Sequence, residues 1–144
     1  MPYRTTNNVT PTFSDFINSE AAAWAVSALF HADPVDVRQK VTSWSDFTSW
    51  ALKARDSFTP GDLYESREAW VHHIRRGFRR WSSGEKALAL GALFAVDYAW
   101  LADDLSTAED EATGQRTSRA FQILQGASGR YAAAVAACVA QVDR

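Results

Sequence analysis

Apolar side chains recur every three or four residues along most of this 144-residue chain. This spacing is typical of one face of an α-helix. The sequence lacks the sustained alternation of apolar and polar residues, and the Asn-Gly turn, that indicate paired strands. Asp33-Pro34 and Thr59-Pro60 each place a capping side chain before a proline, which suits the first turn of a helix. The pattern predicts an all-α protein.

The stretch from Glu85 to Asp104 is the most evenly apolar part of the sequence. Leu90, Leu93 and Leu101 fall on one side of a helix over this stretch, and small, mostly alanine side chains fall on the other. A helix that has no polar face must be covered by other elements. We therefore predict one domain, residues 1–144, built as a compact bundle of about six helices around a central apolar helix over residues 85–104.

The two ends of the chain carry a weaker pattern. Residues 1–11 are polar, and we expect a mobile or extended lead there. A helix is predicted over residues 107–125, with Thr113-Gly114 as a point of interruption. Residues 126–129 then break the pattern before a last helix, which carries Cys138 in its apolar stripe.

Composition narrows the function classes. The most apolar run is interrupted by Asp97 and is shorter than the about 20 residues that a membrane-spanning helix needs, so no membrane association is expected. A formal net charge of −2 provides no overall attraction to nucleic acid. The single cysteine, Cys138, excludes an internal disulfide framework and a cysteine-rich zinc site, and is compatible with the cytoplasm.

Arg67 and Asp97 are the charged residues that fit their helices least well. Arg67 falls inside the apolar arc of the helix that follows Thr59-Pro60, and Asp97 lies midway along the predicted central helix. A buried charge has to be paired, because an unpaired one costs several kcal/mol. One interpretation is an ion pair between Arg67 and Asp97. The other is that Asp97 faces a pocket or a partner, which makes it the leading single candidate for a site residue.

The most basic stretch of the chain contains Arg75, Arg76, Arg79 and Arg80. Four guanidinium groups this close together can grip phosphates. The aromatic residues in this stretch belong to the buried stripe, however, and the acidic pair Asp103-Asp104 provides an internal counter-charge. We therefore expect a solvated, charge-balanced surface in preference to an anion site.

Glu68 and His72 are four residues apart, so that one helix face presents both. This is a spacing at which a helix offers two metal ligands. No second pair supplies the missing ligands, so we expect an exposed pair and no metal site or cofactor.

The six tryptophans guide the choice of function, because no catalytic motif is present. The favoured hypothesis is a non-catalytic helical protein-interaction module, such as a small regulator, inhibitor or immunity-type protein, with another protein as its partner. The alternative is a small-ligand or cofactor-binding protein, either a simple binder or an enzyme, with an aromatic pocket and Asp97 as its polar group. Nucleic-acid binding through Arg75–Arg80 is the third hypothesis. The candidate binding residues are Asp97, Arg67, Trp50, Trp81, Arg75, Arg76, Arg79 and Arg80.

Overall fold

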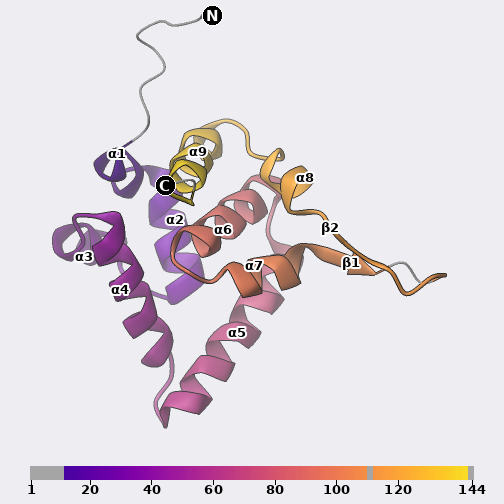
Figure 1. Ribbon diagram of the computed structural model, residues 1–144. Helices are drawn as coiled ribbons and strands as arrows, with labels where there is room; N and C mark the ends of the chain where they lie inside the picture. The colour runs from indigo at the N-terminus through magenta and orange to yellow at the C-terminus, as the bar shows by residue number, and fades with distance from the viewer. Residues whose placement is uncertain (1–11, 110–111, 143–144) are drawn as a thin grey trace, which may run out of the picture.

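Helices account for most of the computed structural model, which describes residues 12–109 and 112–142 (Figure 1). The lead predicted over residues 1–11 lies outside the described residues. The all-α prediction is confirmed, although the described residues form nine helices where about six were expected. The helices are α1 (Phe13–Ile17), α2 (Glu20–Phe30), α3 (Pro34–Lys40), α4 (Trp44–Asp56), α5 (Leu63–Arg80), α6 (Ser83–Ala95), α7 (Ala99–Ser106), α8 (Ala120–Leu124) and α9 (Arg130–Val142), and the strands are β1 (Thr107–Glu109) and β2 (Arg116–Ser118).

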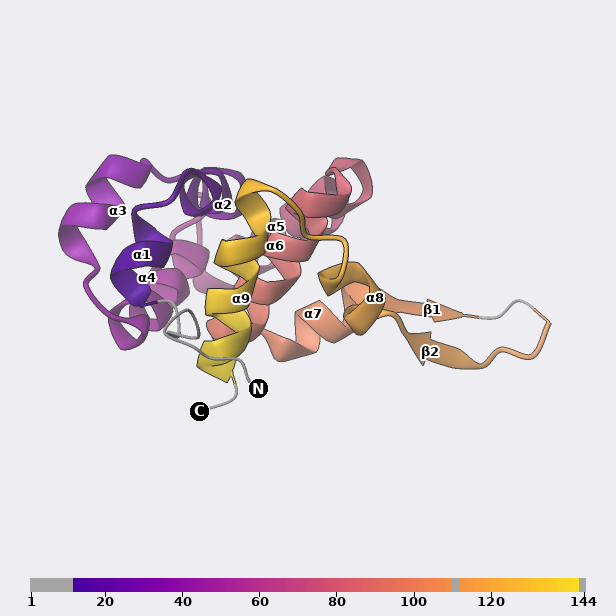
Figure 2. The same cartoon turned by 90° about the horizontal axis from the view of Figure 1, so that it is seen from above.

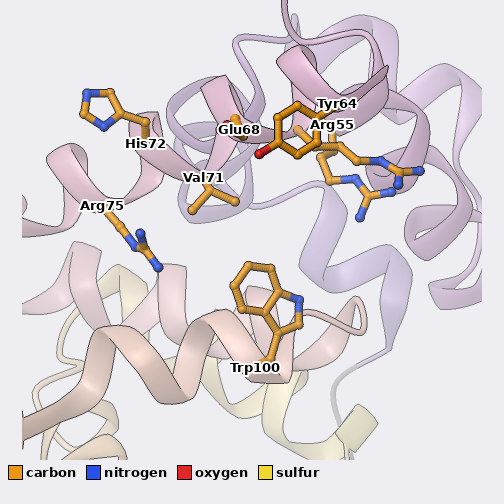
Figure 3. A pocket seen from close by; sticks show the side chains of 8 residues that line it. Arg55, Tyr64, Glu68, Val71, His72, Arg75 and Trp100 are labelled. Atoms are coloured by element: carbon orange, nitrogen blue, oxygen red, sulfur yellow. The ribbon is translucent and has the colours of Figure 1, made fainter. Parts of the chain in front are cut away.

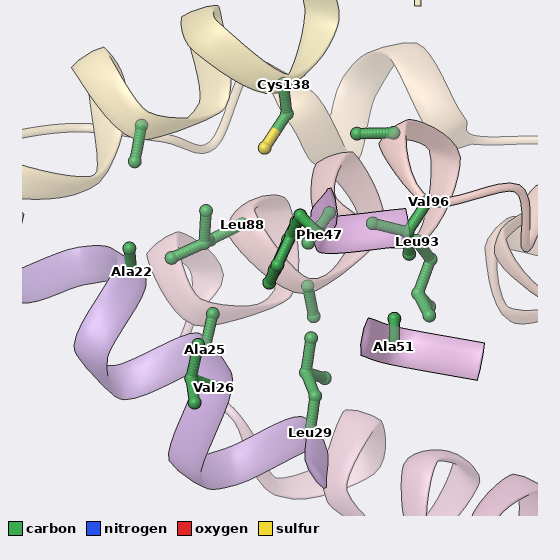
Figure 4. Close-up of a cluster of buried hydrophobic side chains, with 14 of the residues drawn as sticks. Ala22, Ala25, Val26, Leu29, Phe47, Ala51, Leu88, Leu93, Val96 and Cys138 are labelled. Atoms are coloured by element: carbon green, nitrogen blue, oxygen red, sulfur yellow. The ribbon is translucent and has the colours of Figure 1, made fainter. Parts of the chain in front are cut away.

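Helix α6 is the centre of the molecule. It begins with a capping box, in which the Ser82 hydroxyl accepts from the Glu85 N–H and the Glu85 carboxylate accepts from the Ser82 N–H. Residues 87–93 are buried on every side, against α2, α7, α8 and α9. Helix α9 comes so near that a Cβ atom on Gly91 would lie 3.3 Å from the Cβ of Cys138. Figure 4 shows side chains of α2, α4, α6 and α9 meeting in this core.

The central helix does not continue to residue 104, and this part of the prediction is wrong. The chain leaves the helix after Ala95, and Asp97 has a left-handed backbone with φ of 70°. The Tyr98 N–H donates to the Leu93 carbonyl at 2.8 Å, the bond that closes a Schellman C-cap. Asp97 thus occupies the position that glycine usually takes, and the chain turns before α7 begins.

The helix predicted over residues 107–125 is also wrong. Strands β1 and β2 pair antiparallel there, with Thr107 opposite Ser118, and only the short α8 follows. Gly114, with φ of 71°, lies in the connection where the sequence predicted an interruption. Figure 2 shows this hairpin projecting from the helical body. The segment is polar and has no apolar stripe to bury, so packing against the core does not favour a helix here.

The tryptophans divide into core and surface. Trp70 is fully buried, and its indole N–H donates to the Leu29 carbonyl at 2.9 Å. Trp50 stacks on Phe47, Trp81 contacts the edge of Trp24, and both are half-buried against the core. Trp100, by contrast, is 55% exposed. Two of the candidate partner residues, Trp50 and Trp81, are therefore packing residues to a large extent.

Substituting Asp97 distinguishes a left-handed cap from a buried ion pair. Asp97→Gly should leave the free energy of unfolding unchanged or raise it by up to about 1 kcal/mol, because glycine adopts positive φ without a steric cost. Asp97→Ala should be about 1–2 kcal/mol less stable than the glycine variant. The matched change Asp103→Ala, at an exposed position inside α7, should cost nothing. Urea denaturation measures the free energy of unfolding of all three variants. A loss of about 3 kcal/mol in Asp97→Gly would instead indicate that Asp97 takes part in a buried ion pair.

Candidate functional site

Helix α5 positions most of the candidate residues. It begins after Asp62, whose carboxylate accepts from the Glu65 N–H at 2.8 Å, and so starts later than Thr59-Pro60 predicted. The buried Ser66 hydroxyl donates to the Arg55 carbonyl at 2.8 Å and accepts from the Thr59 N–H at 3.2 Å. These bonds hold the start of α5 against the end of α4. The buried face of α5 consists of Ser66, Trp70, Ile74, Gly77 and Phe78.

Arg67 pairs with Asp56 and not with Asp97, so the predicted Arg67–Asp97 ion pair is wrong. The Asp56 carboxylate accepts from the Nε of Arg67 at 2.8 Å and from the Nε of Arg55 at 2.9 Å. The hydrogen bond from Arg67 is the main cause that lowers the pKa of Asp56, and Arg55 lowers it further. The Asp97 side chain is exposed, because the left-handed turn carries it out of the core.

A hollow of about 470 Å³ lies beside this ion-pair cluster, between α5 and α7 (Figure 3). We call it the α5–α7 groove. Tyr64, on α5, and Trp100, on α7, are 71% and 55% exposed, and Val71, also on α5, lines the same hollow. The Nη2 of Arg75 contacts the Asp104 carboxylate at 3.0 Å and ties the two helices together. The groove is lined by Arg55, Tyr64, Arg67, Glu68, Val71, His72, Arg75 and Trp100.

Tyr98 lies in the core next to the ion-pair cluster. Its ring packs on Trp70 with 4.7 Å between centroids, and the Arg55 guanidinium lies 5.5 Å from the ring centre. The hydroxyl is buried and has no hydrogen-bond partner among the described residues. Burial raises the pKa of Tyr98 to about 12, so the phenol stays neutral at physiological pH.

The groove brings together some of the residues predicted from the sequence. Four of them line it; those that do not are Asp97, Trp50, Trp81, Arg76, Arg79 and Arg80. The groove also contains residues that were not predicted from the sequence, namely Arg55, Tyr64, Val71 and Trp100. The shared face of Tyr64, Glu68 and Val71 was readable from helical spacing, but Trp100 was hidden within the predicted central helix. The four residues that were singled out from the sequence and that line the groove are Arg67, Glu68, His72 and Arg75.

The groove offers aromatic faces, guanidinium donors and one carboxylate. Within residues 12–109 and 112–142, no three His, Cys, Asp or Glu side chains come together as a metal site would require, so Glu68 and His72 have no third ligand there. Burial raises the pKa of the Cys138 thiol far above its ordinary value, which disfavours the reactive thiolate. This set of groups is suited to binding.

Comparisons of the chain with protein-family models, with curated proteins and with solved structures found no match. Among the described helices, none has the length and apolar character needed to cross a bilayer.

Removing the Tyr98 hydroxyl tests whether it contributes to stability. Tyr98→Phe should leave the free energy of unfolding unchanged or raise it by about 1 kcal/mol, because a buried hydroxyl without a protein partner carries a desolvation cost. The Tyr131 hydroxyl, which accepts from Arg130 at 3.0 Å, provides the matched control, and Tyr131→Phe should cost up to about 1 kcal/mol. Urea denaturation decides the matter. A loss above about 1 kcal/mol in Tyr98→Phe would reveal a hydrogen bond that this geometry lacks.

Proposed function

We propose that this protein is a non-catalytic protein-interaction module and that the α5–α7 groove is its docking surface. The observation that carries the proposal is the pair of exposed aromatic side chains, Tyr64 and Trp100, on two different helices at one hollow. Tryptophan, tyrosine and arginine are the residues that most often dominate binding energy at protein interfaces. The other tryptophans are wholly or partly buried, which leaves Trp100 as the indole most available to a partner.

The rigidity of the groove supports this proposal. Ser66 fixes the start of α5 on α4, and the Arg75–Asp104 pair joins α5 to α7. Trp100 lies two residues after Tyr98, whose buried ring packs on Trp70. A preformed surface loses little conformational entropy when a partner binds, so more of the contact energy appears as affinity.

The chemistry of the groove favours one kind of occupant, a segment of another protein that carries a carboxylate next to an aromatic or large aliphatic side chain. Arg67 and Arg75 are paired, but their side chains remain 45% and 46% exposed. A guanidinium group has five N–H donors, so each arginine keeps donors for an incoming carboxylate. Val71, Tyr64 and Trp100 provide the apolar surface beside them.

The other hypotheses receive less support from this site. A small-ligand site with Asp97 as its polar group does not match the groove, because Asp97 does not line it. A regulator, inhibitor or immunity-type protein acting in the cytoplasm fits an interaction module of this size, and the cellular location stays a prediction from composition.

A random-peptide phage library panned on the purified full-length protein tests the proposal. Enriched peptides should carry Asp or Glu within a few residues of Phe, Trp or Leu. Synthetic versions should bind the double variant Tyr64→Ala, Trp100→Ala at least about tenfold more weakly than the wild type, because hot-spot truncations commonly cost 2 kcal/mol or more. Fluorescence anisotropy with labelled peptides measures the difference.

Phe121→Ala with Val139→Ala is the matched control, because these apolar residues are also exposed, at 72% and 38%, and do not line the groove. This control should bind the peptides as the wild type does. The proposal is overturned if no peptide is enriched, if the enriched peptides are basic, or if they bind the Tyr64→Ala, Trp100→Ala variant with unchanged affinity.

A further inference from the structure

The last turns of α5 carry a second exposed surface, distinct from the α5–α7 groove. Arg76, Arg79 and Arg80 line a shallow hollow of about 380 Å³ there, and we call them the arginine face. All three side chains are exposed. None of these three arginines lines the α5–α7 groove. The arginine face is therefore available whether or not the groove is occupied.

The sequence predicted that acidic residues balance the charge of the basic stretch. Only Arg75, among the four arginines of that stretch, forms an ion pair with a described residue. Arg75 contacts the Asp104 carboxylate at 3.0 Å, as the acidic pair in the sequence suggested. Among the described residues, no ion pair involves Arg76, Arg79 or Arg80. The end of α5 therefore holds a local excess of positive charge in a chain whose formal net charge is −2.

The partly buried His73 imidazole lies within electrostatic reach of the arginine face. Its Nε2 lies 2.6 Å from the Ala28 carbonyl, and its ring meets that of His31 at 4.3 Å between centroids. Burial is the main cause that lowers the pKa of His73, and the charges of His31, Arg76 and Arg80 lower it further. Arg76 and Arg80 are thus near enough to act on this imidazole by their charge, which links the ring to the arginine face.

The negative end of the helix dipole favours Arg79 and Arg80 in the last turn of α5, but the effect falls off before Arg76. Arg76 and Arg80 are one turn apart on the same side of α5, and Arg79 lies beside them. Guanidinium groups bind phosphate oxygens through paired N–H donors, and several together can surround one multiply charged group.

We propose that Arg76, Arg79 and Arg80 form a binding site for a phosphate-bearing anion. The phosphate belongs either to a free compound or to the backbone of a single-stranded nucleic acid, and both present the same oxygens to the arginines. The bound anion neutralises the charge beside His73. This function is additional to peptide docking in the α5–α7 groove and uses none of its residues.

Two probes test the proposal on the full-length protein, namely sodium tripolyphosphate by calorimetry and a fluorescein-labelled oligothymidylate by anisotropy. At least one should bind at low salt and weaken as salt rises from about 50 to 200 mM. The triple variant Arg76→Gln, Arg79→Gln, Arg80→Gln should lose at least about tenfold in affinity. Circular dichroism checks that its helices remain.

The matched control, Arg38→Gln with Arg116→Gln and Arg119→Gln, removes the same charge from positions outside the arginine face. Its affinity should stay within about threefold of the wild type, because none of these three residues lines the arginine face. Imidazole proton shifts should also show the pKa of His73 rising when the wild type is saturated with the effective probe, and no such rise on adding probe to the triple variant.

Each outcome decides the matter. Binding of tripolyphosphate alone supports the site and identifies a free phosphate compound, whereas tighter binding of oligothymidylate, displaced by tripolyphosphate, identifies a nucleic-acid backbone. Failure of both probes at low salt, or an equal loss in the control variant, would overturn the site. Neither failure touches peptide binding by Tyr64 and Trp100, so the two proposals stand or fall separately.

Discussion

The burial of α6 on all sides is the constraint on which the rest of this structure depends. Each buried methylene contributes about 0.8 kcal/mol, so hiding leucines and alanines around the whole helix is a dominant source of stability. Other helices must then pack against α6 from every direction. On one side, Gly91 allows α9 to approach closely, because glycine has no side chain. At the far end the chain has to turn away, which it does through the left-handed cap at Asp97.

That cap connects the core to the candidate site. It places Tyr98 in the interior against Trp70, and the next turn of chain, α7, then presents Trp100 beside α5. Helix α5 is itself fixed by polar contacts with α2 and α4, through the indole of Trp70 and the hydroxyl of Ser66. The other faces of α5 do not contribute to the buried core. One face lines the α5–α7 groove and another carries the arginine face.

The sequence was informative where burial alone decides the structure. The apolar run that begins at Glu85 predicted α6, and the break over residues 126–129 preceded α9 as expected. The turn at Asp97 could not be predicted, because it contains neither glycine nor proline and apolar residues continue beyond it. Strands β1 and β2 are short and lie at least partly outside the core, so no apolar alternation marks them. Arg67 pairs with Asp56 and not with Asp97, and the sequence could not show this because only the α4–α5 turn brings Asp56 beside Arg67.

The central claim is that the chain turns at Asp97 and that Tyr98 packs on Trp70, which places α7 beside α5. Backbone and side-chain NMR of the full-length protein tests this most directly. The account predicts helical chemical shifts that stop after residue 95, a positive φ at Asp97 and nuclear Overhauser contacts between the rings of Tyr98 and Trp70. Uninterrupted helical shifts from residue 85 to residue 104, without contacts between those rings, would contradict it.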